Sequence, residues 1–374
     1  MELTSEDNLR LNVLFAQNLK AVRIDESKMI VYGLSERGEA KVVLHPNCRD
    51  EKYIKAIREL LSSHFIGSPG GYPVYLRRWT RMGQAKDQSL EKLLLLGEPE
   101  AVVAVVNAAG LTPELAAWAW WALPNAYNAR SMLNNPVIVN SEIGKELATY
   151  LVEYLPFEQE PIDMIETVRL VLQGHLINEE MKQQLWAKGR AKNAYYIGFL
   201  ATTPDDLPEK VAAHPDYDKL EKTLLPLTEK NNPFAKLLLN MSSIAGQSWL
   251  ETAEKVLRKP NNQDVVNILF DVIANHFKSI RPDSYNDEMD ITNLIEKATN
   301  YCEDENNEAI QQVLAVLPEM KSNLIALLVL SGLRYSILRP VFSATTAIGS
   351  LMRKKLMPVT TPIFEQVAIL RGRQ

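Results

Sequence analysis

The sequence predicts a mostly α-helical protein with a small α+β cap at its N-terminus, and three observations support this fold class. From about residue 87 onward, apolar residues recur at helical spacing with little interruption. Turn-forming residues divide that region into segments of a few helical turns, whereas residues 1–66 contain short runs of β-type residues. The hydrophobic content of 46% and charged content of 23% over 374 residues are typical of a globular chain with a sizeable core.

The cap, residues 1–66, is expected to begin with a helix over residues 5–16, because Thr4 and Asp7 fit a capping box. Three β-type runs follow, and the short links between them require antiparallel neighbours, so they form a small meander. A second helix, over residues 50–64, supplies an apolar stripe that covers one face of this sheet. The strands are expected at residues 21–24, 29–34 and 41–44.

Residues 67–86 are expected to join the cap to the helical region. The run GSPGGYP at residues 67–73 concentrates turn-forming residues. It lacks the lysine and the spacing of a phosphate-binding P-loop, and it follows a helix instead of a strand. Aromatic and cationic residues then alternate, with no acidic residue before Asp87. The candidate interaction surface comprises Gly70, Gly71, Tyr72, Tyr75, Arg77, Arg78, Trp79 and Arg81.

Three interpretations of the basic-aromatic segment, residues 72–86, stay open. Its aromatic residues can form the buried face of an ordinary amphipathic helix. Trp and Arg are also enriched in the hot spots of protein–protein interfaces. Aromatic rings beside guanidinium groups are, in addition, what proteins use to bind single-stranded nucleic acid.

Residues 87–339 are expected to form an array of short helices whose tight links make successive helices antiparallel neighbours. The array is α-solenoid-like or irregular, because no repeat of fixed length recurs. Six prolines stand where the first turn of a helix would begin, a place that tolerates the missing N–H. They are Pro99, Pro113, Pro124, Pro208, Pro233 and Pro362.

The most apolar stretch, residues 324–333, lies in a helix expected over residues 321–338. It is shorter than the roughly 20 residues that cross a bilayer, so we expect a buried core helix and no membrane span. The first residues are acidic and do not fit a secretory signal, which favours a cytoplasmic protein. The sequence specifies no oligomeric state.

The basic C-terminal segment, residues 340–374, follows an acidic body. Residues 334–374 contain seven Lys and Arg residues against one Glu, although the whole chain has a net charge of −5. The segment includes a secondary basic patch at Arg353, Lys354 and Lys355. Such a segment binds nucleic acid or an anionic membrane, or docks on the acidic body of its own chain, and we favour docking.

No catalytic, cofactor or metal site is expected. Cys48 and Cys302 have no partner at the spacing of a metal site, and the five histidines include no pair at i, i+4. Basic and aromatic residues at 188–196 are interpreted as cations at the C-terminus of a helix. In the Trp-rich run 118–122 we expect core packing, with one indole at a surface or a domain contact.

Several segments resemble the DsrS family, the "sulfur reduction protein" associated with the dissimilatory sulfite reductase gene cluster of sulfur-oxidising bacteria. They are RIDESKM at 23–29, VYGLS at 31–35, GSPGGYPVYL at 67–76, RWTRMG at 78–83, LLLLGEPEAVV at 93–103, YLVEYLP at 150–156 and NAYYIG at 193–198. The resemblance covers most of the chain and weakens after about residue 210. It implies a cytoplasmic bacterial protein with an accessory role in sulfur metabolism and carries over no site residue.

We therefore expect a non-enzymatic accessory or regulatory protein that binds another protein through its helical array. The alternative is a regulator that binds RNA or DNA through residues 72–86 and the basic C-terminus. A third hypothesis is an enzyme whose site the sequence does not reveal. Iron–sulfur or sirohaem chemistry is not expected, since such centres need clustered cysteine ligands.

Overall fold

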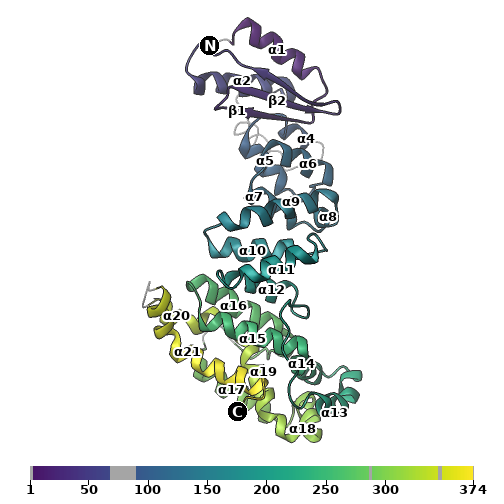
Figure 1. Ribbon diagram of the computed structural model, residues 1–374, viewed down its shortest axis with the longest axis vertical. Helices are drawn as coiled ribbons and strands as arrows, with labels where there is room; N and C mark the ends of the chain where they lie inside the picture. The colour runs from purple at the N-terminus through teal and green to yellow at the C-terminus, as the bar shows by residue number, and fades with distance from the viewer. Residues whose placement is uncertain (1–2, 68–89, 286–288, 344–347, 374) are drawn as a thin grey trace. The chain divides into compact units, whose positions relative to one another are not determined.

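The computed structural model describes residues 3–67, 90–285, 289–343 and 348–373. The chain forms two compact units, residues 1–154 and 155–374, and each is described here by itself. Helices dominate both units, and a single small sheet lies near the N-terminus of the described chain (Figure 1). The predicted fold class, mostly α with an N-terminal α+β cap, is confirmed.

The cap has the predicted order of elements: α1 (Ser5–Phe15), β1 (Ala21–Asp25), β2 (Ile30–Ser35), β3 (Gly38–Val43) and α2 (Asp50–Ile66). The strands form an antiparallel meander in the order β1-β2-β3, as expected. In Figure 1 the sheet lies between α1, which packs on β3, and the helices that begin with α4. Apolar residues of α1, α2 and the three strands share one core cluster.

A buried carboxylate at the start of α1 fastens the cap together. The predicted cap is present, since the Thr4 Oγ1 accepts a hydrogen bond from the Asp7 N–H at 3.2 Å. The Asp7 side chain, fully buried, also accepts from the Tyr53 hydroxyl at 2.6 Å and from the His45 N–H at 2.7 Å. Burial alone would raise the pKa of Asp7, but these hydrogen bonds outweigh it and lower the pKa.

The first unit continues as a run of short helices. Strand β1 of the cap contacts these helices. Its Val22 N–H donates to the Leu94 carbonyl at 2.8 Å, and β1 also packs on α6. These helices are α4 (Leu90–Leu93), α5 (Pro99–Val106), α6 (Pro113–Ala122), α7 (Ala126–Leu133), α8 (Pro136–Val139) and α9 (Glu142–Tyr154).

The Trp-rich run of α6 places two indoles, not one, at a contact with the cap. Trp120 is buried, whereas Trp118 and Trp121 are half-buried. The Lys20 ammonium lies 5.3 Å from the Trp118 ring centroid, and the Arg23 guanidinium lies 4.8 Å from that of Trp121. Cations of β1 and of the residue before it thus hold α6 against the sheet through cation–π contacts.

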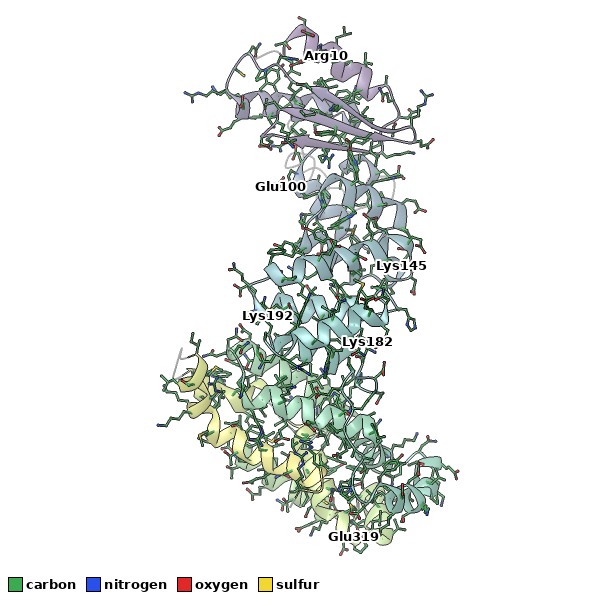
Figure 2. The ribbon with its side chains drawn as sticks, in the orientation of Figure 1. Arg10, Glu100, Lys145, Lys182, Lys192 and Glu319 are labelled. Carbon is green, nitrogen blue, oxygen red and sulfur yellow. The ribbon has the colours of Figure 1, made fainter. Side chains whose placement is uncertain are left out.

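The second unit is an irregular array. Helices far apart in the sequence meet, since α14 packs on α19 and α15 packs on α21. Its main helices are α10 (Pro161–Val171), α11 (Glu179–Lys188), α12 (Ala194–Thr202), α13 (Tyr217–Glu229), α14 (Pro233–Ser242), α15 (Ile244–Arg258), α16 (Gln263–His276), α17 (Ile291–Glu303), α18 (Glu308–Val316), α19 (Lys321–Ser331), α20 (Tyr335–Ser343) and α21 (Gly349–Leu370). Lys182 and Lys192, both labelled in Figure 2, are half-buried, and the Lys182 ammonium pairs with Asp206.

Helix α19 contains most of the apolar stretch predicted to be buried, and the prediction is confirmed: residues 326–331 are all buried. The helix expected over 321–338 is instead two helices, because the chain leaves the helical path at residues 332–334 before α20 begins. No single described helix is long and apolar enough to cross a membrane. The segments Pro318–Ser331 and Tyr335–Ser343 reach the length and apolar composition of a membrane span only when taken together, and a bend of 64° separates them.

Half of the six proline predictions are wrong. Pro99, Pro113 and Pro233 do begin α5, α6 and α14. By contrast, Pro124 lies two residues before α7, because Asn125 caps that helix, and Pro208 lies in an irregular segment. Pro362 lies inside α21, as Pro358 does. A proline in the sequence therefore does not by itself mark the start of a helix. Helix α21 continues through Pro358 and Pro362, although neither residue has a backbone N–H to donate.

Candidate functional site

The candidate interaction surface at Gly70, Gly71, Tyr72, Tyr75, Arg77, Arg78, Trp79 and Arg81 lies outside the described residues. Only Gly67, at the start of that segment, is described. It ends α2 with a φ of +64°, a left-handed conformation that glycine adopts without strain. The predicted surface therefore stays a prediction.

The secondary basic patch lies in the first two turns of α21. Arg353 is half-buried, and Lys354 and Lys355 are exposed. Within the described ranges, none of the three forms an ion pair. Apolar side chains stand beside them, since Leu351 is 54% exposed and Met357 is 57% exposed. This part of the basic C-terminal segment does not dock on acidic residues of the described chain.

A different group of cations surrounds a pocket of about 530 Å³ in the second unit. We call it the C-terminal basic pocket. It lies where the end of α11 and the start of α12 meet the last turns of α15 and of α21. Its cationic lining consists of Arg190, Lys255, Arg258, Lys259, Arg371 and Arg373.

The end of α21 aims two of these cations into the pocket. Gly372 adopts a φ of +62°, the Arg373 N–H donates to the Ala368 carbonyl at 3.0 Å, and the Gly372 N–H donates to the Ile369 carbonyl at 3.1 Å. This pair of bonds is a Schellman motif, which reverses the chain immediately after the helix. Gly372 also packs on His214, so the turn has a fixed position in its unit.

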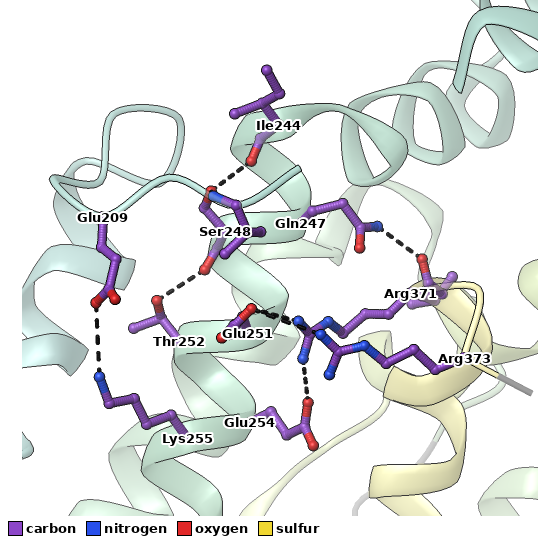
Figure 3. Close-up of polar contacts among 12 residues, drawn as sticks. Glu209, Ile244, Gln247, Ser248, Glu251, Thr252, Glu254, Lys255, Arg371 and Arg373 are labelled. Carbon is purple, nitrogen blue, oxygen red and sulfur yellow. Dashed lines mark hydrogen bonds and ion pairs between the residues drawn. The ribbon is translucent and has the colours of Figure 1, made fainter. Parts of the chain in front are cut away.

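The same end of α21 is held by α15. The Gln247 side chain, itself buried, donates to the Leu370 carbonyl at 2.9 Å (Figure 3). The Arg371 guanidinium donates to Glu254 at 2.6 Å and to Glu251 at 2.5 Å, and its side chain is only 4% exposed. We call Arg371, Glu251 and Glu254 the α15–α21 clamp.

Electrostatics in the clamp favour the charged form of Glu254. Burial alone would raise the pKa of Glu254, but hydrogen bonds from Arg258 and Arg371 outweigh burial and hold the pKa below its usual value of 4.5. Figure 3 shows Arg373 beside Arg371 on the same carboxylate, Glu251, from which it lies 3.9 Å away. Both carboxylates of the pocket are thus engaged by arginines.

Some polar atoms of the pocket wall have no partner. The Tyr196 hydroxyl, the Asn193 Oδ1 and the Arg371 Nε are buried and form no hydrogen bond within the described chain. Tyr196 is 1% exposed, and the Lys255 ammonium covers its ring at 4.8 Å from the centroid. Buried polar groups of folded proteins nearly always have a partner, so three in one wall call for an explanation.

Residues 188–196, which the sequence indicates as cations at a helix end, also form part of the pocket wall. Gly189, Arg190, Asn193 and Tyr196 line the pocket, whereas Lys192 turns away and donates to the carbonyls of residues 156 and 158. The sequence could not show that Arg371 and Arg373, almost two hundred residues later, complete the lining.

The favoured interpretation of the basic C-terminal segment, docking on the acidic body, fits its last residues, because Arg371 and Arg373 pair with carboxylates of α15.

Among the described residues, no group of three or more His, Cys, Asp or Glu is placed to hold a metal ion. Comparison of the chain with protein-family models, with curated proteins and with solved structures finds no match.

Proposed function

We propose that the chain is a non-catalytic binding protein that docks an acidic, amphipathic segment of another protein on the exposed face of α21. The observation that carries the proposal is the composition of that face. Leu351, Lys354, Lys355 and Pro358 follow the i, i+3, i+4, i+7 spacing of one helix face, and all four are exposed. Apolar and cationic side chains alternate there within two helical turns.

The mixture of side chains favours a protein partner. A face that binds nucleic acid gains its affinity from phosphate contacts, and exposed aliphatic side chains contribute little to such contacts. An acidic amphipathic helix, in contrast, would cover Leu351 with apolar residues and pair carboxylates with Lys354 and Lys355. The acidic residues of such a partner would complement Lys354 and Lys355, which form no ion pair with described residues.

A peptide assay with the full chain tests this proposal. The probe is a designed helical peptide with a Glu-rich face and a Leu-rich face, and its scrambled sequence is the control peptide. We expect binding to the designed peptide alone, weakened about tenfold by Lys354→Glu with Lys355→Glu and by Leu351→Ser. The matched control is Lys222→Glu with Lys230→Glu, an equal change of charge at exposed lysines of the same unit.

Two results would overturn the proposal. One is equal binding of designed and scrambled peptides, which would mean that charge alone acts. The other is tight binding of a single-stranded RNA oligonucleotide that falls steeply with salt and responds to the lysine variant but not to the Leu351 variant. That second outcome would favour the alternative, a nucleic-acid-binding regulator.

From the resemblance to the DsrS family, we further propose a cytoplasmic accessory role in bacterial sulfur metabolism. This role rests on the sequence segments that carry the resemblance. An affinity pull-down from the native host with the wild-type chain and with an Arg77→Ala, Trp79→Ala, Arg81→Ala variant tests it. Loss in the variant of a sulfur-metabolism protein that the wild type captures would support the role and the surface at residues 70–81. Equal capture of the same proteins would count against that surface.

A further inference from the structure

We propose that the C-terminal basic pocket binds a phosphorylated small molecule that carries at least two negative charges. This inference concerns another part of the second unit than the face of α21 and goes beyond the proposed protein docking. It rests on charge, on the partnerless polar atoms of the wall, and on the size of the pocket.

The charge of the lining leaves cations without counter-ions. Six Lys and Arg side chains surround the pocket against two carboxylates, Glu251 and Glu254. Arg371 takes part in ion pairs with both of these carboxylates, and Arg258 shares Glu254. Arg190 and Lys259 form no ion pair with any residue in the described ranges. Cations gathered in a concave wall repel one another, and a bound polyanion relieves that repulsion.

The partnerless atoms match such a ligand in kind. The Tyr196 hydroxyl and the Arg371 Nε are hydrogen-bond donors, which suit phosphate oxygens, and the Asn193 Oδ1 is an acceptor, which suits a hydroxyl or an amino group. Arg371 is held in place by the clamp, so the direction of its Nε–H is already fixed.

Access to the Tyr196 hydroxyl requires a side chain to move. The Tyr196 hydroxyl has no exposed surface, and the Lys255 side chain lies over the Tyr196 ring. Lys255 is exposed, and its pairing with Glu209 is long, at 3.8 Å. A ligand phosphate can draw the Lys255 ammonium off the ring and so uncover the wall, because an exposed lysine changes rotamer at little cost.

The pocket volume sets the size of the ligand. Sites for small molecules and cofactors typically measure about 300 to 1,000 Å³, and the pocket measures about 530 Å³. Inorganic phosphate would fill a small part of it. A nucleotide or a sugar bisphosphate would reach cations on both sides, from Arg190 at the end of α11 to Arg373 beyond α21.

Calorimetric titration of the full chain tests the proposal with pyrophosphate, ADP, fructose 1,6-bisphosphate and inorganic phosphate, against sodium chloride at matched ionic strength. We expect saturable binding of at least one of the first three, and weaker binding of phosphate. Pyrophosphate as tight as ADP would show that the site recognises phosphate groups alone, whereas tighter ADP would show a nucleotide site. Each of these two results supports the proposal.

Two variants separate a ligand site from a chance cluster of charge. Arg190→Glu with Lys259→Glu should weaken binding at least tenfold, whereas Lys222→Glu with Lys230→Glu, with the same change of charge elsewhere in the unit, should not. Tyr196→Phe removes a hydroxyl that has no partner in the described chain, so it should leave the melting temperature of the free protein unchanged. It should nevertheless weaken ligand binding about threefold to tenfold, the usual worth of one hydrogen bond.

The proposal is overturned by either of two results. One is the absence of saturable binding for all four phosphates. The other is binding that the control lysine variant weakens as much as the pocket variant, which would indicate attraction by net charge only. Neither result bears on the peptide assay of the α21 face, because none of the pocket variants changes a residue of that face.

Discussion

The two ends of α21 carry similar side chains and use them in opposite ways. At its start, Lys354 and Lys355 are exposed and form no ion pair within the described chain. Just past its end, Arg371 is almost completely buried and takes part in ion pairs with two carboxylates of α15. Both sets belong to one basic segment of the sequence.

The difference shows that the charge of a segment does not determine the role of its cations. A buried guanidinium needs carboxylates beside it, because an uncompensated buried charge is costly. An exposed ammonium needs none, since water solvates it. The position of α15 therefore decides which cations are structural and which are available to a partner.

The largest effect should come from breaking the clamp. Arg371→Ala removes the cation shared by Glu251 and Glu254, and breaking a buried ion pair typically costs several kcal/mol. Glu251 is 44% exposed and Glu254 retains Arg258, so we expect about 2–3 kcal/mol less stability. Urea denaturation of the wild type and the variant measures the difference.

The matched substitution at the other end of the helix is Lys354→Ala, which should change stability by less than about 0.5 kcal/mol. If both variants lose the same stability, the contrast between the two ends is wrong and the clamp has no special part in the fold.

A second comparison isolates packing from backbone strain. Gly349, at the start of α21, and Gly372, just beyond its end, both have a φ of +62°. Apart from its neighbours along the chain, a methyl group at Gly349 would meet no atom of the described residues within 4 Å, whereas one at Gly372 would lie 2.6 Å from the His214 Nε2. The left-handed backbone costs an alanine roughly 1–2 kcal/mol at both sites.

Gly372→Ala should therefore destabilise by about 2 kcal/mol or more, and Gly349→Ala by about 1 kcal/mol. Thermal unfolding followed by circular dichroism compares the two. Equal losses would mean that His214 moves aside without cost, and the Schellman turn would then not be fixed by its neighbours.

Local patterns explain what the sequence predicted well. Helix α1 spans Ser5–Phe15, close to the expected residues 5–16, and Thr4 caps it as its spacing with Asp7 indicates. Such features depend on residues three or four positions apart. The burial of Asp7 beneath Tyr53 and His45 depends on contacts about forty residues away, and nothing local marks it.

The candidate pocket was beyond prediction for the same reason. Residues 188–196 combine Lys, Arg and Tyr, but this mixture is equally typical of an ordinary helix end. What turns Arg190 and Tyr196 into a pocket wall is the arrival of Arg371 and Arg373 from the end of α21. Proline signals failed likewise at Pro362, where packing of α21 overrides a local preference.

The clamp should also give stability a dependence on acid pH. The pKa of Glu254 is lower in the folded chain than its usual value of 4.5, so the unfolded chain binds protons more readily. The contribution of Glu254 is complete above about pH 5 and is lost as the pH falls through the lowered pKa of the folded state. We expect stability to fall over this range, because protonation removes the charge that Arg258 and Arg371 stabilise in the folded chain.

Urea denaturation at intervals between pH 6 and pH 3 measures this loss in the wild type and in Glu254→Gln. The variant should start less stable and lose less stability over that range, because its amide does not titrate. Parallel curves for the two proteins would show that other carboxylates cause the acid sensitivity.

The smallest effect on stability should come from the cations at the start of α21, which are the counterpart of Arg371 at its other end. Replacing Arg353, Lys354 and Lys355 together by Ala removes three positive charges that form no ion pair with described residues. Alanine also has a higher helix propensity than lysine or arginine. Stability should therefore stay within about 0.5 kcal/mol of the wild type. Urea denaturation at low and at high salt provides the measurement.

A loss above about 1 kcal/mol that disappears at high salt would show that these cations stabilise the fold electrostatically, as Arg371 does. An unchanged curve would leave binding as the role that requires them, because a fold that is indifferent to three cations gives no structural reason for their place on an exposed, partly apolar helix face.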